Sequence, residues 1–545
     1  MTATKKRGAD ALIRSLQQAG VKRIFTLSGN HIMPVFDAAF DAGIELIHTR
    51  HEAATVHMAD AYARITGEPG IALVTGGPGH ANAVSALYTA QMAESPVVLL
   101  SGHAPNNQLG MGAFQEMRQA ELAAPVTKFS SISASADALA SDVVNAIRVA
   151  QSGRPGPVHL SLPTDALEAE TSAANVTVDA SAFEPVKMSM SSADAASFLA
   201  RLSRAKRPLI LAGPASMTRV RREQLVALEA ATCIPVIGME SPRGIADPSL
   251  GAFAQMLAQS DCVLLLGKRL DFTLKFGAAP AFAADCEFLQ IDSDAHEIER
   301  SRRAVASRLV ATAEADTPSA IHALIAASSS AVKTDTAWRD DVRAAIAYRP
   351  DAWNHATSII ADRLHPVQAL RPLQAFLDSH PDSVFISDGG EIGQWAQACL
   401  NAPHRVINGV AGAIGAALPF ALGARVAVPD APIIAVMGDG TFGFHTAEMD
   451  TAVRYGLPFV AVVGNDARWN AEYQIQLRDY GPARLIGCEL LPTRYDQVTA
   501  AFGGHGEHVT SATALIPAAE RAIASGKPSC MNVMIEGLPA PNIRH

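Results

Sequence analysis

Short apolar runs alternate with helix-length segments along the whole chain. In the first third, runs such as IALV (71–74) and PVVLL (96–100) stop at a polar residue or at glycine, and amphipathic stretches separate them. Uninterrupted apolar runs of this length are typical of parallel strands that are buried on both faces and joined by crossover helices. The pattern therefore predicts a doubly wound α/β fold.

Two polar breaks divide this pattern, at residues 168–187 and 326–336. A chain of 545 residues is long enough for about three domains. The sequence predicts three doubly wound parallel-sheet domains, at 1–170, 190–330 and 355–545. Such sheets bind ligands beyond the carboxyl ends of their strands, so the polar residues that follow the apolar runs are the candidates for chemistry.

Composition and charge narrow the classes of partner. The net charge is −9 with no basic block, which argues against nucleic acid or an anionic membrane surface. No apolar run reaches the roughly 20 residues that span a bilayer, and the basic start lacks the apolar core of a signal peptide. The six cysteines are far apart with no C-x-x-C pair, so neither a zinc site nor a disulfide framework is indicated and a reduced, cytoplasmic location is expected.

A glycine-rich loop, MGDGTFG (437–443), follows the apolar run APIIAVM and precedes a helix-like stretch, 444–456. Its glycines fall as G-x-G-x-x-G, the spacing of a dinucleotide-binding turn. Asp439 lies inside this turn, where a carboxylate repels phosphate unless a cation cancels its charge. Asp466 follows the next apolar run.

Three interpretations of the loop remain open from these residues. One is a dinucleotide site, with Asp466 as the ribose-binding acid. Another is a Mg²⁺ site in which Asp439 and Asp466, at the ends of neighbouring strands, hold the ion against a diphosphate. The third is a tight turn with a solvated aspartate, because a single G-x-G-x-x-G is a weak signal.

A second stretch, HTRHEAATVH (48–57), places Glu52 at a predicted strand-to-helix junction among apolar neighbours. The ordinary explanation is a carboxylate that the dipole of the helix N-terminus favours. A functional explanation requires a partner elsewhere in the chain.

Together the two stretches resemble the thiamine-diphosphate (ThDP) enzymes of the acetolactate synthase-like family, closest to the 2-hydroxyacyl-CoA lyase and benzaldehyde lyase branch. The resemblance covers nearly the whole chain, and its strongest blocks are IFTLSGNHIMPVFDA, TRHEAATVHMADAYARITG, LVTGGPGHANAVSALYTAQMAESPVVLLSG, RPGPVHLSLPTD, GAIGAALPFALGA and the GDG-to-GND segment. It implies a pyrimidine-binding, a central and a diphosphate-binding domain. It also favours the metal interpretation of the loop over the dinucleotide one.

The resemblance implies a Mg²⁺ site made of Asp439, Asp466 and the main-chain carbonyl of Arg468. The family motif is GDG followed about 27 residues later by Asn-Asn, and Asp466 stands 27 positions after Asp439 where relatives have the second Asn. An aspartate retains oxygen ligands for Mg²⁺. The same resemblance assigns cofactor contacts to the neighbouring residues Gly438, Gly440, Thr441 and Asn465.

Further roles follow from the resemblance alone. Glu52 matches the glutamate that hydrogen-bonds the aminopyrimidine and activates the cofactor. Ile414 matches the apolar wedge that bends the cofactor, where relatives often have Met, and Gly412 offers its carbonyl to the exocyclic amine. Gly390 and Glu391 match contacts beside the diphosphate, although relatives often have Gln at the position of Glu391.

His31 and Gln115 match residues near the substrate in several relatives, and His31 is a candidate proton shuttle. The ordinary explanation for His31 is a loop histidine bonded to backbone. The expected activity is a carbon–carbon lyase or carboligase that cleaves a 2-hydroxyacyl compound, with a CoA thioester as the favoured substrate, to an aldehyde and formyl-CoA. The alternatives are acetolactate synthase and a non-catalytic ThDP- or nucleotide-binding regulator.

The resemblance also implies partners. Relatives are homodimers or homotetramers with the cofactor at the subunit interface. Their central domain binds FAD, an ADP moiety or nothing, so FAD or an ADP or CoA moiety is a candidate ligand there. The remaining expected partner is the small-molecule substrate.

Overall fold

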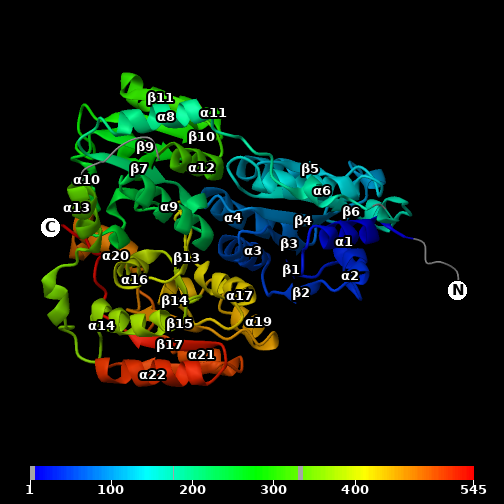
Figure 1. Cartoon of the computed structure of the whole chain (residues 1–545). Coiled ribbons are helices and arrows are strands. Elements are labelled where there is room, and N and C mark those ends of the chain that lie inside the picture. Colours follow the sequence, from blue (N-terminus) through cyan, green and yellow to red (C-terminus); the bar gives the residue numbers. More distant parts are fainter. Residues whose placement is uncertain (1–5, 176, 329–335, 545) are drawn as a thin grey trace. The chain divides into compact units, whose positions relative to one another are not determined.

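The computed structural model describes residues 6–175, 177–328 and 336–544 (Figure 1). Within these ranges the strands form three sheets, all with parallel pairing. The predicted fold class is confirmed. No helix among the described residues is both long enough and apolar enough to cross a bilayer.

The N-terminal sheet has the strand order β2-β1-β3-β4-β6-β5. Its strands are β1 (Arg23–Thr26), β2 (Glu45–His48), β3 (Gly70–Val74), β4 (Val97–His103), β5 (Ser130–Ile132) and β6 (Val158–Pro163). The helices around it are α1 (Gly8–Gln18), α2 (Met33–Ala39), α3 (Glu52–Thr66), α4 (Pro78–Met92), α5 (Gln119–Ala123), α6 (Leu139–Gln151) and α7 (Thr164–Glu168). Every residue of β3 and β4 is buried, as helices on both faces of a parallel sheet require.

The central sheet has the order β11-β10-β9-β7-β8. Its strands are β7 (Pro208–Ala212), β8 (Val236–Gly238), β9 (Cys262–Leu266), β10 (Glu287–Asp292) and β11 (Leu309–Glu314). Its helices are α8 (Ser192–Leu202), α9 (Arg219–Thr232), α10 (Phe253–Leu257), α11 (Ala295–Val305), α12 (Thr317–Ser328) and α13 (Thr336–Ala347). The predicted break at 326–336 lies largely outside the described residues.

The C-terminal sheet has the order β13-β12-β14-β15-β17-β16. Its strands are β12 (Val384–Ser387), β13 (His404–Ile407), β14 (Ile433–Gly438), β15 (Val460–Asn465), β16 (His505–Val509) and β17 (Ser529–Met534). Its helices are α14 (Pro366–Leu370), α15 (Gln374–Asp378), α16 (Gly390–Cys399), α17 (Ala417–Ala427), α18 (Asp439–Phe442), α19 (Glu448–Arg454), α20 (Asn470–Tyr480), α21 (Tyr495–Ala501) and α22 (Ala512–Ala524). Numbered within each sheet, the N- and C-terminal sheets share one order, 2-1-3-4-6-5, and strand order reverses between the first and third strands of each.

The helix after the glycine-rich loop is shorter than the sequence suggests. The helix-like stretch 444–456 contains only α19, which begins at Glu448. The hydroxyl of Thr446 donates to the carbonyl of Phe442 at 2.7 Å, a local bond that competes with helix formation. The loop therefore contains a single helical turn, α18, which starts at Asp439.

By internal contacts the chain divides into two compact units. One is Met1–Val186 with Pro419–Ala427 and Ala447–Leu457, so α19 and most of α17 pack with the N-terminal sheet. The other contains the central sheet and the rest of the C-terminal domain. The domain boundaries at 170, 190, 330 and 355 stay predictions.

Candidate functional site

The glycine-rich loop lies at the carboxyl end of the C-terminal sheet. Gly438, the last residue of β14, pairs with Gly464 of β15. Asp439 follows Gly438 directly and Asp466 comes two residues after Gly464, so the parallel register brings both acids to the carboxyl end of the sheet. This edge adjoins β12, across which the strand order reverses, and that is where open α/β sheets bind ligands.

Both aspartates are buried, and burial makes their charged forms unfavourable. Asp439 is 1% exposed and burial raises its pKa to about 6. Burial and then the charge of Asp439 raise the pKa of Asp466 to about 7. One carboxylate oxygen of Asp439, Oδ2, is buried without a hydrogen-bond partner. A buried, unpartnered carboxylate oxygen beside a second carboxylate fits a divalent cation, which relieves both the desolvation and the repulsion.

Main-chain groups complete the surroundings of this acid pair. The main-chain N–H groups of Ala467 and Arg468 lie close enough to Asp439 to oppose the rise in its pKa, which places the turn that contains the Arg468 carbonyl beside the acids. No cluster of three or more His, Cys, Asp or Glu side chains suited to a metal occurs in the described ranges. A site made of two carboxylates and one main-chain carbonyl has only two of these side chains. It leaves coordination positions of the metal open for phosphate oxygens and water.

Two glycines at this end of the sheet pack closely against side chains. A Cβ at Gly440 of the loop would lie 2.6 Å from the Trp469 ring, and one at Gly464 of β15 would lie 2.6 Å from Ile392. The hydroxyl of Thr441 donates to the carbonyl of Gly438 at 3.1 Å, which closes the turn. The loop therefore presents main-chain N–H groups without intervening side chains, an arrangement that suits phosphate oxygens.

Asn465 is fully buried rather than displayed at the surface of the loop. Its amide nitrogen donates to Asn532 Oδ1 and to the Thr493 carbonyl, each at 3.0 Å. Its Oδ1 accepts the N–H of Ala467 at 3.2 Å. The structure thus shows Asn465 holding the turn that carries Asp466, while its predicted cofactor contact stays a prediction.

Asp388, which sequence reasoning did not single out, organises the neighbouring loop. This residue follows β12, is 1% exposed, and burial raises its pKa to about 6. Its carboxylate accepts the N–H groups of Gly389, Gly415 and Ala417 at 2.7, 2.9 and 3.0 Å. The available signal was its position after an apolar run in SDGG, the same context as Asp439.

The loop held by Asp388 carries two predicted contacts. Gly412 has φ +66°, a left-handed conformation that favours glycine. Ile414 is 37% exposed, so its apolar side chain is available to a ligand and is compatible with a wedge. Their cofactor roles stay predictions.

Glu391 lies in the first turn of α16, next to Gly390. Burial raises its pKa, and its carboxylate pairs with Arg243 at 3.3 Å. Both residues line a cleft of about 980 Å³. Other cations on its wall are Lys275, Arg478 and Arg544.

Glu52 begins α3, as predicted, and the helix ends at Gly67 in a left-handed conformation. The ring of His51 caps the helix by accepting the N–H of Ala53 at 3.1 Å. The Glu52 carboxylate accepts a hydrogen bond from the side-chain amide of Asn82 in α4 at 3.0 Å. Glu52 is therefore a positioned carboxylate with a side-chain partner.

His31 and Gln115 lie near the ends of strands β1 and β3, where the order of the N-terminal sheet reverses. His31 is 3% exposed, and its Nδ1 is 3.3 Å from the Thr75 hydroxyl. Its ring stacks on Phe114, with centroids 5.8 Å apart, and burial lowers its pKa. Gln115 has φ +56° and packs against Gly77, where a Cβ would lie 2.7 Å from its own. His31 is thus neutral at neutral pH and bonded to a side chain.

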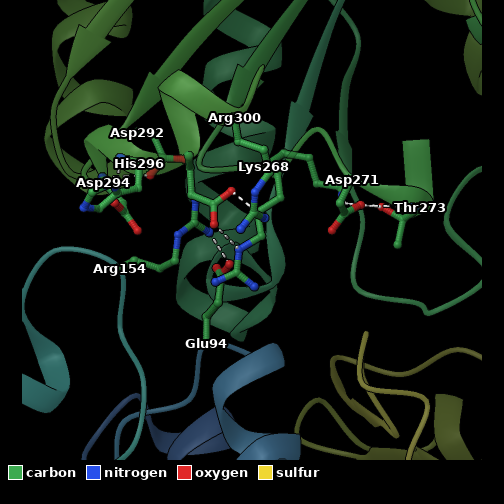
Figure 2. Close-up of polar contacts among 11 residues, drawn as sticks. Glu94, Arg154, Lys268, Asp271, Thr273, Asp292, Asp294, His296 and Arg300 are labelled. Atoms are coloured by element: carbon green, nitrogen blue, oxygen red, sulfur yellow. Dashed lines mark hydrogen bonds and ion pairs between the residues drawn. The ribbon is translucent and has the colours of Figure 1, made fainter. Parts of the chain in front are cut away.

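The central sheet also has a point of reversed strand order, between β7 and β9. Lys268, just after β9, is 2% exposed, and its ammonium donates to Thr273 Oγ1 at 2.7 Å and lies 3.7 Å from Asp271 (Figure 2). At the end of β10, Asp292 Oδ1 accepts the N–H of Asp294. Arg300 pairs with Glu297 at 3.0 Å. Each of these cations is already partnered within the domain.

The three sheets match three known families in chain order. Residues 6–122 match the "Thiamine pyrophosphate enzyme, N-terminal TPP binding domain", residues 195–318 the "central domain", and residues 388–533 the "C-terminal TPP binding domain". A protein named "Probable acetolactate synthase" from Mycobacterium bovis is 32% identical over 96% of this chain and 95% of its own. The chain belongs to the thiamine pyrophosphate enzymes.

Two other relatives of this thiamine pyrophosphate enzyme carry different names. "2-hydroxyacyl-CoA lyase 2" from Danio rerio is 30% identical over 97% of this chain and 92% of its own. "Oxalyl-CoA decarboxylase" from Escherichia coli is 30% identical over 97% and 95%. Membership confirms the family resemblance and the thiamine diphosphate cofactor. The individual roles of Glu52, His31, Gln115 and the loop residues stay predictions.

Proposed function

We propose that the enzyme is a Mg²⁺- and ThDP-dependent carbon–carbon lyase and carboligase that acts on 2-hydroxyacyl-CoA. It cleaves the C1–C2 bond of R–CH(OH)–CO–SCoA to R–CHO and formyl-CoA, and the reverse reaction joins the same two products. ThDP, when bound, supplies the carbanion chemistry that this cleavage requires.

The observation that carries the choice of a CoA thioester is the cationic cleft beside Glu391. Arg243, Lys275, Arg478 and Arg544 line it, and neither Lys275 nor Arg544 forms an ion pair with a described residue. CoA carries several phosphate charges, and a volume of about 980 Å³ is at the upper end of ligand pockets. By contrast, Lys268 and Arg300 on the central sheet already have acidic partners, which makes FAD or ADP there the weaker proposal.

The chain's own residues divide the work. Asp439, Asp466 and the Arg468 carbonyl hold Mg²⁺, and the main-chain groups of the glycine-rich loop bind the diphosphate. Glu52 hydrogen-bonds the aminopyrimidine. Neutral His31 accepts the proton of the substrate 2-hydroxyl while the C1–C2 bond breaks, because a base with a lowered pKa is unprotonated and ready to accept.

The alternative is acetolactate synthase, which the similarity to the Mycobacterium bovis protein favours. We also propose a homodimer or homotetramer in the cytoplasm. The exposed apolar side chains of Met111 and Phe114, 77% and 68% accessible, lie on the loop that carries Gln115 and support burial of that loop against a second subunit.

A substrate comparison tests the proposal. Purified enzyme with ThDP and Mg²⁺ is offered a 2-hydroxyacyl-CoA or pyruvate, and aldehyde with formyl-CoA is the expected product. The double variant Lys275→Ala/Arg544→Ala should weaken CoA binding about tenfold in calorimetry, since two exposed cations contribute roughly 0.5–1 kcal/mol each. Lys527→Ala, an exposed lysine outside the cleft, is the control. Acetolactate from pyruvate, without any cleavage of CoA thioester, would contradict the proposal.

A further inference from the structure

Hydrogen bonds to neighbouring groups hold the backbone around Glu52 in place. Glu448 of α19 is fully buried, and its carboxylate accepts the Arg50 N–H at 3.0 and 3.2 Å. The main-chain N–H of His51 lies close enough to Glu448 to oppose the rise in its pKa, and the His51 ring caps α3. The turn between β2 and α3 therefore has little freedom, and the remaining variable at Glu52 is the direction of its carboxylate.

That direction is set from α4. The side-chain amide nitrogen of Asn82 donates to Glu52 Oε2 at 3.0 Å. Glycine at position 79 gives the carboxylate room, because a Cβ there would lie 3.3 Å from Glu52 Oε1. The two oxygens thus differ: Oε2 is bonded to α4 and Oε1 lies over the first turn of that helix.

The turn that starts α4 is itself fixed. Gln119 Oε1 accepts the N–H of Gly77 at 2.8 Å, and its amide donates to the Gly102 carbonyl at 3.0 Å and to Ser161 Oγ at 2.9 Å. Gln119 is fully buried. Asn82 therefore projects from a helix whose start is tied to β4 and β6, so its backbone is held in place relative to Glu52.

We propose that Asn82 is a positioning residue that assigns separate tasks to the two oxygens of Glu52. By occupying Oε2, it keeps Oε1 directed for the hydrogen bond to the aminopyrimidine N1′ of ThDP. A carboxylate without this partner rotates about its last side-chain bond, and its oxygens exchange places. This inference rests on the proposed role of Glu52 and extends it to a residue of another helix.

The test compares the binding of two ligands, so that it does not depend on turnover. Dissociation constants are measured by calorimetry, with Mg²⁺, for ThDP and for an analogue in which pyrimidine N1′ is replaced by C–H. Asn82→Leu, of similar size, should lower the preference for ThDP about tenfold, because the Glu52 carboxylate loses the charge-assisted hydrogen bond that keeps Oε1 directed toward N1′. Affinity for the analogue should stay unchanged, and exchange of the thiazolium C2 proton should slow by a similar factor.

Two further variants separate the possible failures. Asn82→Asp replaces the donor with a second carboxylate and should lose more preference than Asn82→Leu. Ser85→Ala, one turn further along α4, should keep the wild-type preference and melting temperature. A wild-type preference in both Asn82 variants, alongside a reduced one in Glu52→Ala, would overturn the role of Asn82 alone. Equal preference in wild type and Glu52→Ala would overturn the role of Glu52 and this inference with it.

Discussion

The N- and C-terminal sheets have the same strand order and carry different chemistry. In each sheet the strand order reverses between the first and third strands. In the C-terminal sheet that edge holds buried acids, Asp388, Asp439 and Asp466, whose pKa values burial raises. In the N-terminal sheet the corresponding edge holds neutral His31 and the glycines beside Gln115. The two sheets thus share a topology but differ in the chemistry of the loops at the carboxyl ends of their strands.

Glu52 lies in a different environment from these aspartates. It follows β2, an edge strand, is partly exposed, and one of its oxygens accepts a side-chain amide. Asp439 follows β14, an interior strand, and its buried Oδ2 has no hydrogen-bond partner. A single, partly exposed carboxylate suits hydrogen bonding to a ligand nitrogen, whereas two neighbouring buried carboxylates suit a cation.

The largest effect is expected at Glu52. Glu52→Gln keeps the size and removes the charge, so it should lower the rate of C2-proton exchange and of turnover by about 10²–10⁴-fold, the usual contribution of general acid–base catalysis. Affinity for ThDP should change little. Stopped-exchange NMR and calorimetry measure the two, with the exposed Glu45→Gln as control. Unchanged exchange would show that the N-terminal edge has no activating acid.

Asp439 should affect binding rather than activation. Asp439→Asn removes one charge from the predicted metal site, and loss of a ligand or its support typically costs about 10–100-fold in metal affinity. The dissociation constants for Mg²⁺ and for ThDP should both rise, whereas the exposed Asp479→Asn should leave them unchanged. If ThDP binds Asp439→Asn as tightly as wild type, Asp439 does not contribute to cofactor binding through a metal.

The smallest expected effect is on stability as a function of pH. The folded-state pKa values of Asp439 and Asp466, about 6 and about 7, lie above the ordinary value of 3.8, so the folded apo-protein binds more protons than the unfolded chain. Its free energy of unfolding should therefore fall as pH rises from about 4 to 7. The stabilisation by Mg²⁺ with ThDP should grow over pH 6–7, because metal binding needs the deprotonated acids.

Melting curves of apo- and holoprotein at pH 5.5, 6.5 and 7.5 test this dependence. The double variant Asp439→Asn/Asp466→Asn removes both titrating groups and should flatten the apo curve. A wild-type slope in that variant would place the titrating groups elsewhere in the protein.

The sequence predicts apolar strands well and misses polar edge strands. Runs such as VVLL and IIAVM become β4 and β14, which are buried on both faces. By contrast, β5, with the sequence SSI, and β16, with HGEHV, are partly exposed edge strands. Their alternation is too polar to separate them from loops, because an edge strand needs less apolar surface and gains its pairing from the sheet.

Residues of the candidate site also differ in whether the sequence points to them. Local motifs, read through the family resemblance, make Glu52, Asp439 and Asp466 candidates, because short loops at strand ends carry ligand-binding residues as local sequence. Asp388 and Asn82 have no such spacing: the first acts by accepting N–H groups 27 and 29 residues further along, and the second by reaching a residue 30 positions away. The local sequence is sufficient to predict the fold class and to point to the acids. Which of these acids are desolvated, which have partners and in which direction they are held follow from the folded structure, because those properties arise from contacts between segments that are distant in the chain.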